Sequence, residues 1–444
     1  MKSLILHKTD GLGARLREIL VGLTLCRLLG WPLAIQWDLS GRWIEHRGWH
    51  DHLDQDRIFD TAWLEQYVDQ GDGMRAVSTH NHWPLNRLDR VLMGLRSRSV
   101  LLKKVPKDPG RLIDFKNEPE VRRLLQEAFE SIGFSMTARQ ALEAGRARAP
   151  EHGVAVHVRQ GDVVKGEYRF HGNWTDKAIP APVARLIGKK LLDGGRSPVM
   201  VSADECFLEW EDVTTDKARI SAKKPTDPVG AMFYDIGLMS GCESIVMGGD
   251  CNFGLIAAWS ACRTISKTSD VLSLNDLRRI ADSLLDGSLD APDALDRAYT
   301  AQWLLIQERK ALREEQRDAL LELARESDPD NPVYYMINAA HALMRGDEHE
   351  AETQAGEAVR ARERLDDYLE SRFATDLGFG AKRLLDGKEA VALAEFRAVT
   401  GSSLAEVWEW VRKCSGWRQL SVPLHTKVLR RSRSLVMKPL RVLR

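Results

Sequence analysis

The sequence predicts an α/β protein with parallel sheets in two lobes, followed by an all-α region. Strand-like and helical stretches alternate up to about residue 288, and no strand pattern remains beyond it. Several strand candidates are apolar at nearly every position, which is typical of parallel strands buried on both faces. The expected domains are residues 1–145, 146–288 and 289–420, with a basic tail at 421–444.

Composition limits the class of protein. The 444 residues are 43% hydrophobic and 29% charged, which is enough for two or three domains with substantial cores. Lys+Arg and Asp+Glu number 64 each, so the net charge gives no reason to expect a nucleic-acid partner. The six cysteines form no CxxC pair, and no uncharged stretch approaches the ~18 apolar residues of a membrane span. These features favour a cytoplasmic protein with reduced thiols.

The N-terminal segment predicts a strand, a glycine-rich turn, a helix and a second strand. The strands are SLILHK and PLAIQW, and the helix DGLGARLREILVGLTLCRLLG has apolar residues at helical spacing on one face. Asp10, Gly11 and Gly13 occupy the turn, where glycine permits close approach of a ligand and the helix N-terminus can bind an anion. A tight turn without a ligand is the alternative. Residues 40–145 are expected to be rich in loops.

Beyond residue 150 the alternation predicts a second parallel sheet. Its strand candidates are VAVHVR, SPVMVSAD, ESIVMGG and RTISKTS, separated by helical stretches that include FYDIGLMSG and FGLIAAWSAC. Ligands of such sheets bind beyond the carboxyl ends of the strands. The segments HVRQGD, SAD and GGDCNFG all follow strands, so we expect them to converge on one site.

The C-terminal region is helical and contains a weak internal repeat. NPVYYMINAAHALMRGDEHEAETQAGEAV and RFATDLGFGAKRLLDGKEAVALAEFRAV look like degenerate tetratricopeptide repeats, although the step from Glu350 to Glu389 exceeds the usual period of about 34 residues. A plain helical bundle is the alternative. The last 20 residues carry seven Lys or Arg and no acid, which is typical of a tail that lies on an anionic membrane or stays solvated.

In this order the motifs resemble the fucosyltransferase superfamily, which includes α-1,2, α-1,6 and nodulation fucosyltransferases. The DGLGARLREI turn and helix, HVRQGD, VSADECFLEW and MFYDIGLMSGCESIVMGGDCNFGLIAAWSAC resemble successive family motifs and cover most of residues 1–265. The resemblance implies a GT-B fold, with two Rossmann-like lobes facing across a cleft, the first on the acceptor side and the second on the donor side. It also implies inverting, metal-independent transfer of fucose from GDP-fucose to a glycan hydroxyl, with no cofactor.

Two departures from the family pattern keep alternatives open. Gln160 stands where many members have a second arginine, and DCNFG replaces a loop rich in Ser and Thr. The same fold with another nucleotide-sugar donor is one alternative. The other is a degenerate transferase that acts as a scaffold through its helical repeats.

The expected site residues follow from the chemistry and the resemblance. Arg159 is expected to neutralise the leaving diphosphate, because guanidinium forms charge-assisted, often bidentate hydrogen bonds to phosphate. His157 points to the same side of the strand as Arg159 and is expected to hold the donor or to orient the arginine; an ordinary core histidine is the alternative. The candidates for the general base are Asp10 and Glu167. The other expected donor-binding residues are Gly11, Gly13, Asp162, Asp204, Asp235, Asn252, Phe253 and Gly254.

The alternative for Asp204 and Asp235 is a structural role as turn and helix-cap carboxylates. The expected partners are a nucleotide sugar and a glycan or glycolipid acceptor. A protein partner is expected for the helical repeats, and a peripheral contact with the inner membrane face for the basic tail.

Overall fold

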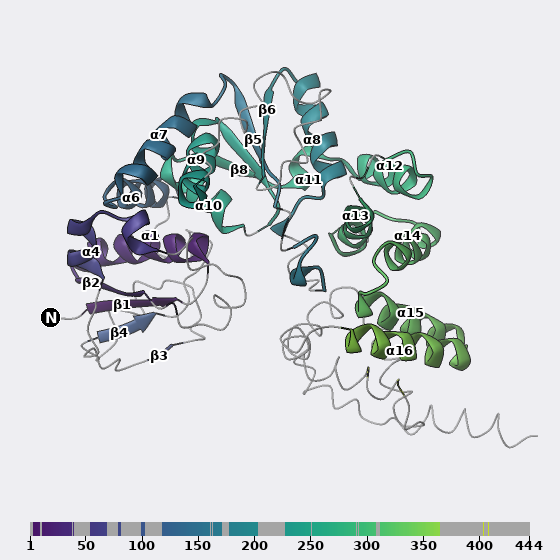
Figure 1. The fold of residues 1–444 in the computed structure, drawn as a ribbon. Coiled ribbons are helices and arrows are strands. Elements are labelled where there is room, and N and C mark those ends of the chain that lie inside the picture. The colour runs from purple at the N-terminus through teal and green to yellow at the C-terminus, as the bar shows by residue number, and fades with distance from the viewer. Residues whose placement is uncertain are drawn as a thin grey trace, which may run out of the picture. The chain divides into compact units, whose positions relative to one another are not determined.

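The protein is a mixed α/β structure, mostly helical, with parallel sheets (Figure 1). The computed structural model describes residues 3–8, 11–37, 39, 54–68, 79–80, 99–102, 118–159, 161, 163–170, 177–202, 227–249, 251–289, 291, 293–307, 311–364, 403 and 407.

The strands are β1 (Ser3–Lys8), β2 (Leu33–Trp37), β3 (Thr79–His80), β4 (Ser99–Leu102), β5 (Gly153–His157), β6 (Ser197–Val201), β7 (Ser244–Met247) and β8 (Thr264–Ser266). The helices before residue 200 are α1 (Leu12–Leu29), α3 (Gln55–Ile58), α4 (Thr61–Tyr67), α6 (Glu118–Glu130), α7 (Met136–Arg148), the 3-10 helix η3 (Glu167–Phe170) and α8 (Ala181–Asp193). The later helices are α9 (Pro228–Gly241), α10 (Asn252–Ser260), α11 (Thr268–Val271), α12 (Leu274–Leu285), α13 (Ala294–Gln307), α14 (Glu314–Ser327), α15 (Pro332–Arg345) and α16 (Glu348–Glu363).

The first sheet has the parallel order β2-β1-β4-β3. Its strands β1 and β2 and the intervening α1 confirm the expected strand, turn, helix and strand. The apolar face expected for α1 is buried, and burial extends to every residue from Leu12 to Cys26. The helix packs against β1 and β2 and also against α6 and α10, so neighbours cover it on several sides.

The second sheet has the parallel order β6-β5-β7-β8, and its four strands confirm the four strand candidates. The chain passes from β5 to β6 on one side and then crosses back to β7 on the other, which makes the gap between β5 and β7 a topological switch point. Helix α8 packs on β5 and β6, whereas α9 packs on β5 and α10 packs on β7 and β8. Ala155 belongs to the core shared with α9 and α10, so the alternating odd positions of β5 face these two helices.

The expectation of a loop-rich segment at 40–145 is wrong for its end. Residues 118–148 form α6 and α7, and α7 runs through position 145. In α6, four apolar residues at helical spacing are buried: Val121, Leu125, Ala128 and Phe129. The charged residues between them lie on the opposite face, so α6 has the amphipathic pattern of a surface helix.

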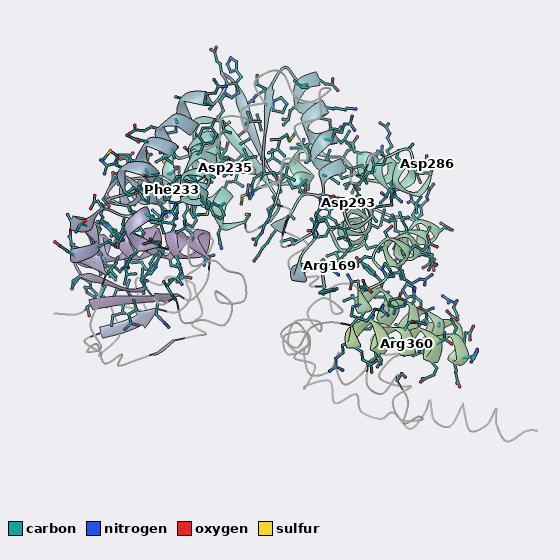
Figure 2. The ribbon with its side chains drawn as sticks, viewed as in Figure 1. Arg169, Phe233, Asp235, Asp286, Asp293 and Arg360 are labelled. Atoms are coloured by element: carbon teal, nitrogen blue, oxygen red, sulfur yellow. The ribbon has the colours of Figure 1, made fainter. Side chains whose placement is uncertain are left out.

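Helices α7 and α9 pack unusually close because glycines line their contact. A Cβ on Gly237 would overlap the backbone carbonyl of Leu142, and a Cβ on Gly145 would overlap the carbonyl of Tyr234. The buried Phe233 of α9, labelled in Figure 2, has its ring centroid 4.9 Å from that of Phe134. The α7 and α9 contact thus depends on backbone approach as much as on side-chain burial.

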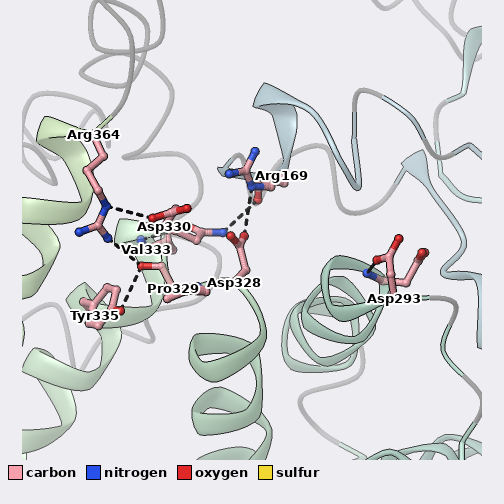
Figure 3. Close-up of polar contacts among 10 residues, drawn as sticks. Arg169, Asp293, Asp328, Pro329, Asp330, Val333, Tyr335 and Arg364 are labelled. Atoms are coloured by element: carbon pink, nitrogen blue, oxygen red, sulfur yellow. Dashed lines mark hydrogen bonds and ion pairs between the residues drawn. The ribbon is translucent and has the colours of Figure 1, made fainter.

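The chain divides into two compact units. The first comprises residues 1–166 and 174–317, and the second comprises 167–173 and 318–444. In the second unit, Arg169 Nε lies 3.2 Å from Asp328 Oδ2, and Asn331 Nδ2 donates to the Arg169 carbonyl at 3.5 Å (Figure 3). Asn331 also accepts from Val333 N at 3.2 Å and so caps α15. These bonds tie η3 to the start of α15.

Helices α15 and α16 pack on each other as a pair, joined at Gly346 in a left-handed conformation with φ 80°. The second sequence repeat and the basic tail lie outside the described residues. Within the part of the chain that the structure describes, no helix is long and apolar enough to cross a membrane.

Replacing Gly237 by alanine is expected to lower the free energy of unfolding by about 2 kcal/mol, because the new methyl group must displace the Leu142 backbone. The matched control is Gly356→Ala in α16, where a Cβ meets nothing closer than 3.7 Å. That control is expected to stabilise its helix by about 0.5–1 kcal/mol. Calorimetric unfolding of both variants checks this. A Gly237→Ala protein as stable as wild type would contradict the close contact.

Candidate functional site

The carboxyl end of β5 places two basic side chains beside the switch point of the second sheet. In register, His157 pairs with Val201 of β6 and with Met247 of β7, so the three strands end at the same level. Val158 continues the pairing by donating from its N–H to the Val201 carbonyl at 2.8 Å. His157 is 9% exposed, and Arg159, two residues later, is half-buried. The buried strand β5 therefore places the His157 imidazole and the Arg159 guanidinium at the edge of the sheet.

The N-terminus of α10 lies at the end of the neighbouring strand β7. Cys251 is the N-cap residue and makes no cap hydrogen bond through its side chain. A Cβ on Gly254 would overlap Met247 Sδ, so the glycine allows α10 to begin directly against β7. The first amides of a helix carry partial positive charge, and this end of α10 therefore favours an anion.

His157 and Cys251 form a buried pair at this point. Burial lowers the pKa of His157, but a hydrogen bond to Cys251, the thiolate charge and Asp235 outweigh burial and the Arg159 charge, and they raise it. Burial raises the pKa of Cys251, yet the charge and hydrogen bond of His157, followed by Arg159 and the Gly254 N–H, lower it to about 6. The Asp235 side chain on α9 is labelled in Figure 2. The two residues thus favour an imidazolium and thiolate pair near neutral pH.

The glycine-rich turn of the first sheet contacts the same helix N-terminus. Gly11 is the N-cap of α1, and its carbonyl accepts from Ala14 N at 3.0 Å. A Cβ on Gly13 would lie 3.0 Å from two atoms of the Phe253 ring. Gly13 is therefore needed for close packing of α1 on α10, which is a reason for this glycine that does not involve a ligand.

A buried arginine strengthens this contact. Arg17 Nη1 donates to Asn252 Oδ1 at 2.8 Å, and Arg17 Nη2 lies 3.1 Å from Glu18 Oε1. Arg17 is 4% exposed and Glu18 is 1% exposed, so both charges are removed from water. The bond fixes the orientation of the Asn252 amide, whose NH2 group can donate to a ligand.

The expected site residues divide into three groups. The described contacts bring together His157, Arg159, Asp235 and the α10 start, with Gly13 against it. Glu167 begins η3 in the second unit, and its side chain lies outside the described part. The residues that lie wholly outside the described part are Asp10, Asp162 and Asp204.

Sequence reasoning missed Cys251, Arg17 and Glu18. The place of Cys251, directly before a helix and after a strand, is a signal in the sequence for an activated thiol. Arg17 and Glu18 carry no such signal, because adjacent charges on a helix are usually solvated. Among the described residues no group of three metal-ligating side chains gathers.

The chain was compared with known proteins. No family model matches it, and no curated protein does. Among solved structures, POFUT1 in complex with GDP-fucose is similar at 11% identity and a TM-score of 0.33, over 60% of this chain and 97% of that chain. Its apo form gives 11% and 0.32 over the same shares, and its complex with GDP gives 11% and 0.31 over 60% and 98%. TM-scores this low do not establish a common fold.

Replacing Arg17 by methionine is expected to lower the free energy of unfolding by about 3 kcal/mol, because it removes the cation beside the buried Glu18 carboxylate. The double variant Arg17→Met, Glu18→Met is expected to regain much of this loss, because a buried ion pair is often replaceable by apolar groups. Denaturant unfolding of the single and double variants measures the coupling. If the losses of unfolding free energy of the two single variants simply add in the double variant, the two charges do not interact.

Proposed function

We propose that this chain is a glycosyltransferase of the GT-B type that holds a nucleotide sugar at the switch point between β5 and β7. The observation that carries the proposal is the meeting of Arg159 and His157 with the N-terminus of α10 at one sheet edge. A leaving diphosphate needs cationic side chains and aligned amides where its charge develops. Both are present at this edge, and parallel sheets bind ligands at such points.

The reaction follows from this placement. The acceptor hydroxyl attacks the anomeric carbon in line from the side of the first sheet, and the configuration inverts. A carboxylate takes the hydroxyl proton, and Asp10 is the candidate from the first unit. Arg159 and the amides of α10 hold the departing diphosphate, so the transfer requires no metal.

The order of the sequence motifs supports GDP-fucose as the donor and a glycan or glycolipid hydroxyl as the acceptor. The helical region then recruits a protein partner or positions the acceptor, and the basic tail contacts an anionic membrane surface. One observation favours a second candidate, a different nucleotide sugar. Asn252 is the only polar side chain in the NFG segment that opens α10, and Arg17 already engages its carbonyl.

Arg159→Ala is expected to weaken GDP binding about 100-fold, because a charge-assisted pair to phosphate is lost. The matched control is Arg196→Ala, at the opposite end of the same sheet, where Arg196 Nη2 lies 2.6 Å from Glu243 Oε2. Its GDP affinity is expected to stay within about twofold of wild type.

The test is calorimetric titration, which measures the affinity for GDP, GDP-fucose, GDP-mannose and UDP-sugars with and without a chelator. A preference for UDP-sugars would show that the donor is a UDP-sugar and not GDP-fucose. If no nucleotide binds, the protein is a scaffold that acts through its helical region.

A further inference from the structure

The pair formed by His157 and Cys251 is unusual because it places a thiol where the anion of a ligand is expected. Cys251 is 1% exposed and is the residue from which α10 begins. A thiol at a helix N-terminus and beside an imidazole ionises readily, because the helix dipole and the imidazolium both favour the thiolate. The thiolate would occupy the position that the helix offers to a phosphate.

His157 supplies an independent sign that a ligand belongs here. Its side chain is more than nine-tenths buried, and its Nδ1 has no hydrogen-bond partner within the described part of the chain. A buried polar nitrogen without a partner is costly, and such atoms commonly meet a ligand or water. The nitrogen sits at the sheet edge with Arg159, two residues further along the chain.

The charged groups that face His157 come from three elements. Arg159 follows β5 and opposes the imidazolium, whereas Asp235 on α9 and Cys251 on α10 favour it. Burial alone would keep the imidazole neutral, so its charge in the empty protein depends mainly on Cys251. Gln160 supplies no second guanidinium, so a protonated His157 is the second cation that the end of β5 itself contributes beside Arg159.

We infer that Cys251 is a displaceable counter-ion, which stays a thiolate beside protonated His157 in the empty site and gives up its charge when a diphosphate binds. The diphosphate takes over the positive end of α10 and the imidazolium. The thiolate then takes one proton from the solvent, an S–H bond forms, and no other bond changes. His157 keeps its proton and directs its charge to the phosphate. This inference rests on the proposed function, because the displacing anion is the diphosphate of the donor.

The mechanism gives Cys251 a positioning role for the proposed transfer. While the site is empty, the thiolate keeps His157 protonated despite its burial. When the donor binds, two cations instead of one face the leaving group, and one proton is taken up for each diphosphate bound.

The test is the ultraviolet absorbance of the thiolate in the full chain, followed against pH. Wild type is expected to lose one thiolate with a midpoint of about pH 6, which Cys251→Ser removes. His157→Asn is expected to raise the midpoint to about 8.5 or higher, because the imidazolium is gone. Cys242→Ser is the control. Burial raises the pKa of Cys242 to about 12, so its loss leaves the absorbance unchanged.

The decisive measurement needs no variant. Inorganic pyrophosphate and GDP are added to wild type at about pH 7.5, and the absorbance of one thiolate is expected to disappear. Binding of either anion without loss of the thiolate, or no thiolate in the empty protein, overturns the inference and leaves the proposed function standing. Loss of the thiolate with pyrophosphate but no binding of GDP supports the inference and removes the nucleotide-sugar function. Failure of both anions to bind overturns both.

Discussion

The hydrogen bond from Arg17 to Asn252 is the contact on which the site depends, because it joins helix α1, which packs on the first sheet, to helix α10, which packs on the second. A charge removed from water must be paired, and Arg17 satisfies this by meeting Glu18 and the Asn252 amide at once. The start of α10 is thereby fixed against α1. Gly13 allows the backbone of α1 to come close enough for that bond.

The same demand for pairing shapes the other side of α10. His157 is too deeply buried to remain charged by itself, and Cys251 is too deeply buried to ionise by itself. The charge of each residue stabilises the charge of the other, and Asp235 and the helix dipole add to this effect. At this edge of the sheet, a bound anion can therefore take the place of the thiolate charge while Cys251 takes up a proton.

Much of the fold could be predicted from the sequence, because apolar runs and their period report burial directly. The strands β1, β2 and β5–β8 and the helices α1, α9 and α10 follow from such runs. The helices α6 and α7 were missed, and for α7 the reason is that three of the four residues it buries are small: Ala138, Ala141 and Gly145. Small residues give a weak periodic signal, although here Gly145 lets the backbones of α7 and α9 approach each other closely.

The sequence by itself determined which chemical groups end the strands of the second sheet, since HVRQGD and GGDCNFG follow apolar runs of strand length. Only the tertiary structure decided which of these groups meet. The strand order puts β7, which is not the next strand in sequence, beside β5, and so brings Cys251 to His157 across 94 residues of chain. Strand order depends on the packing of helices on both faces of a sheet, and no local pattern records it.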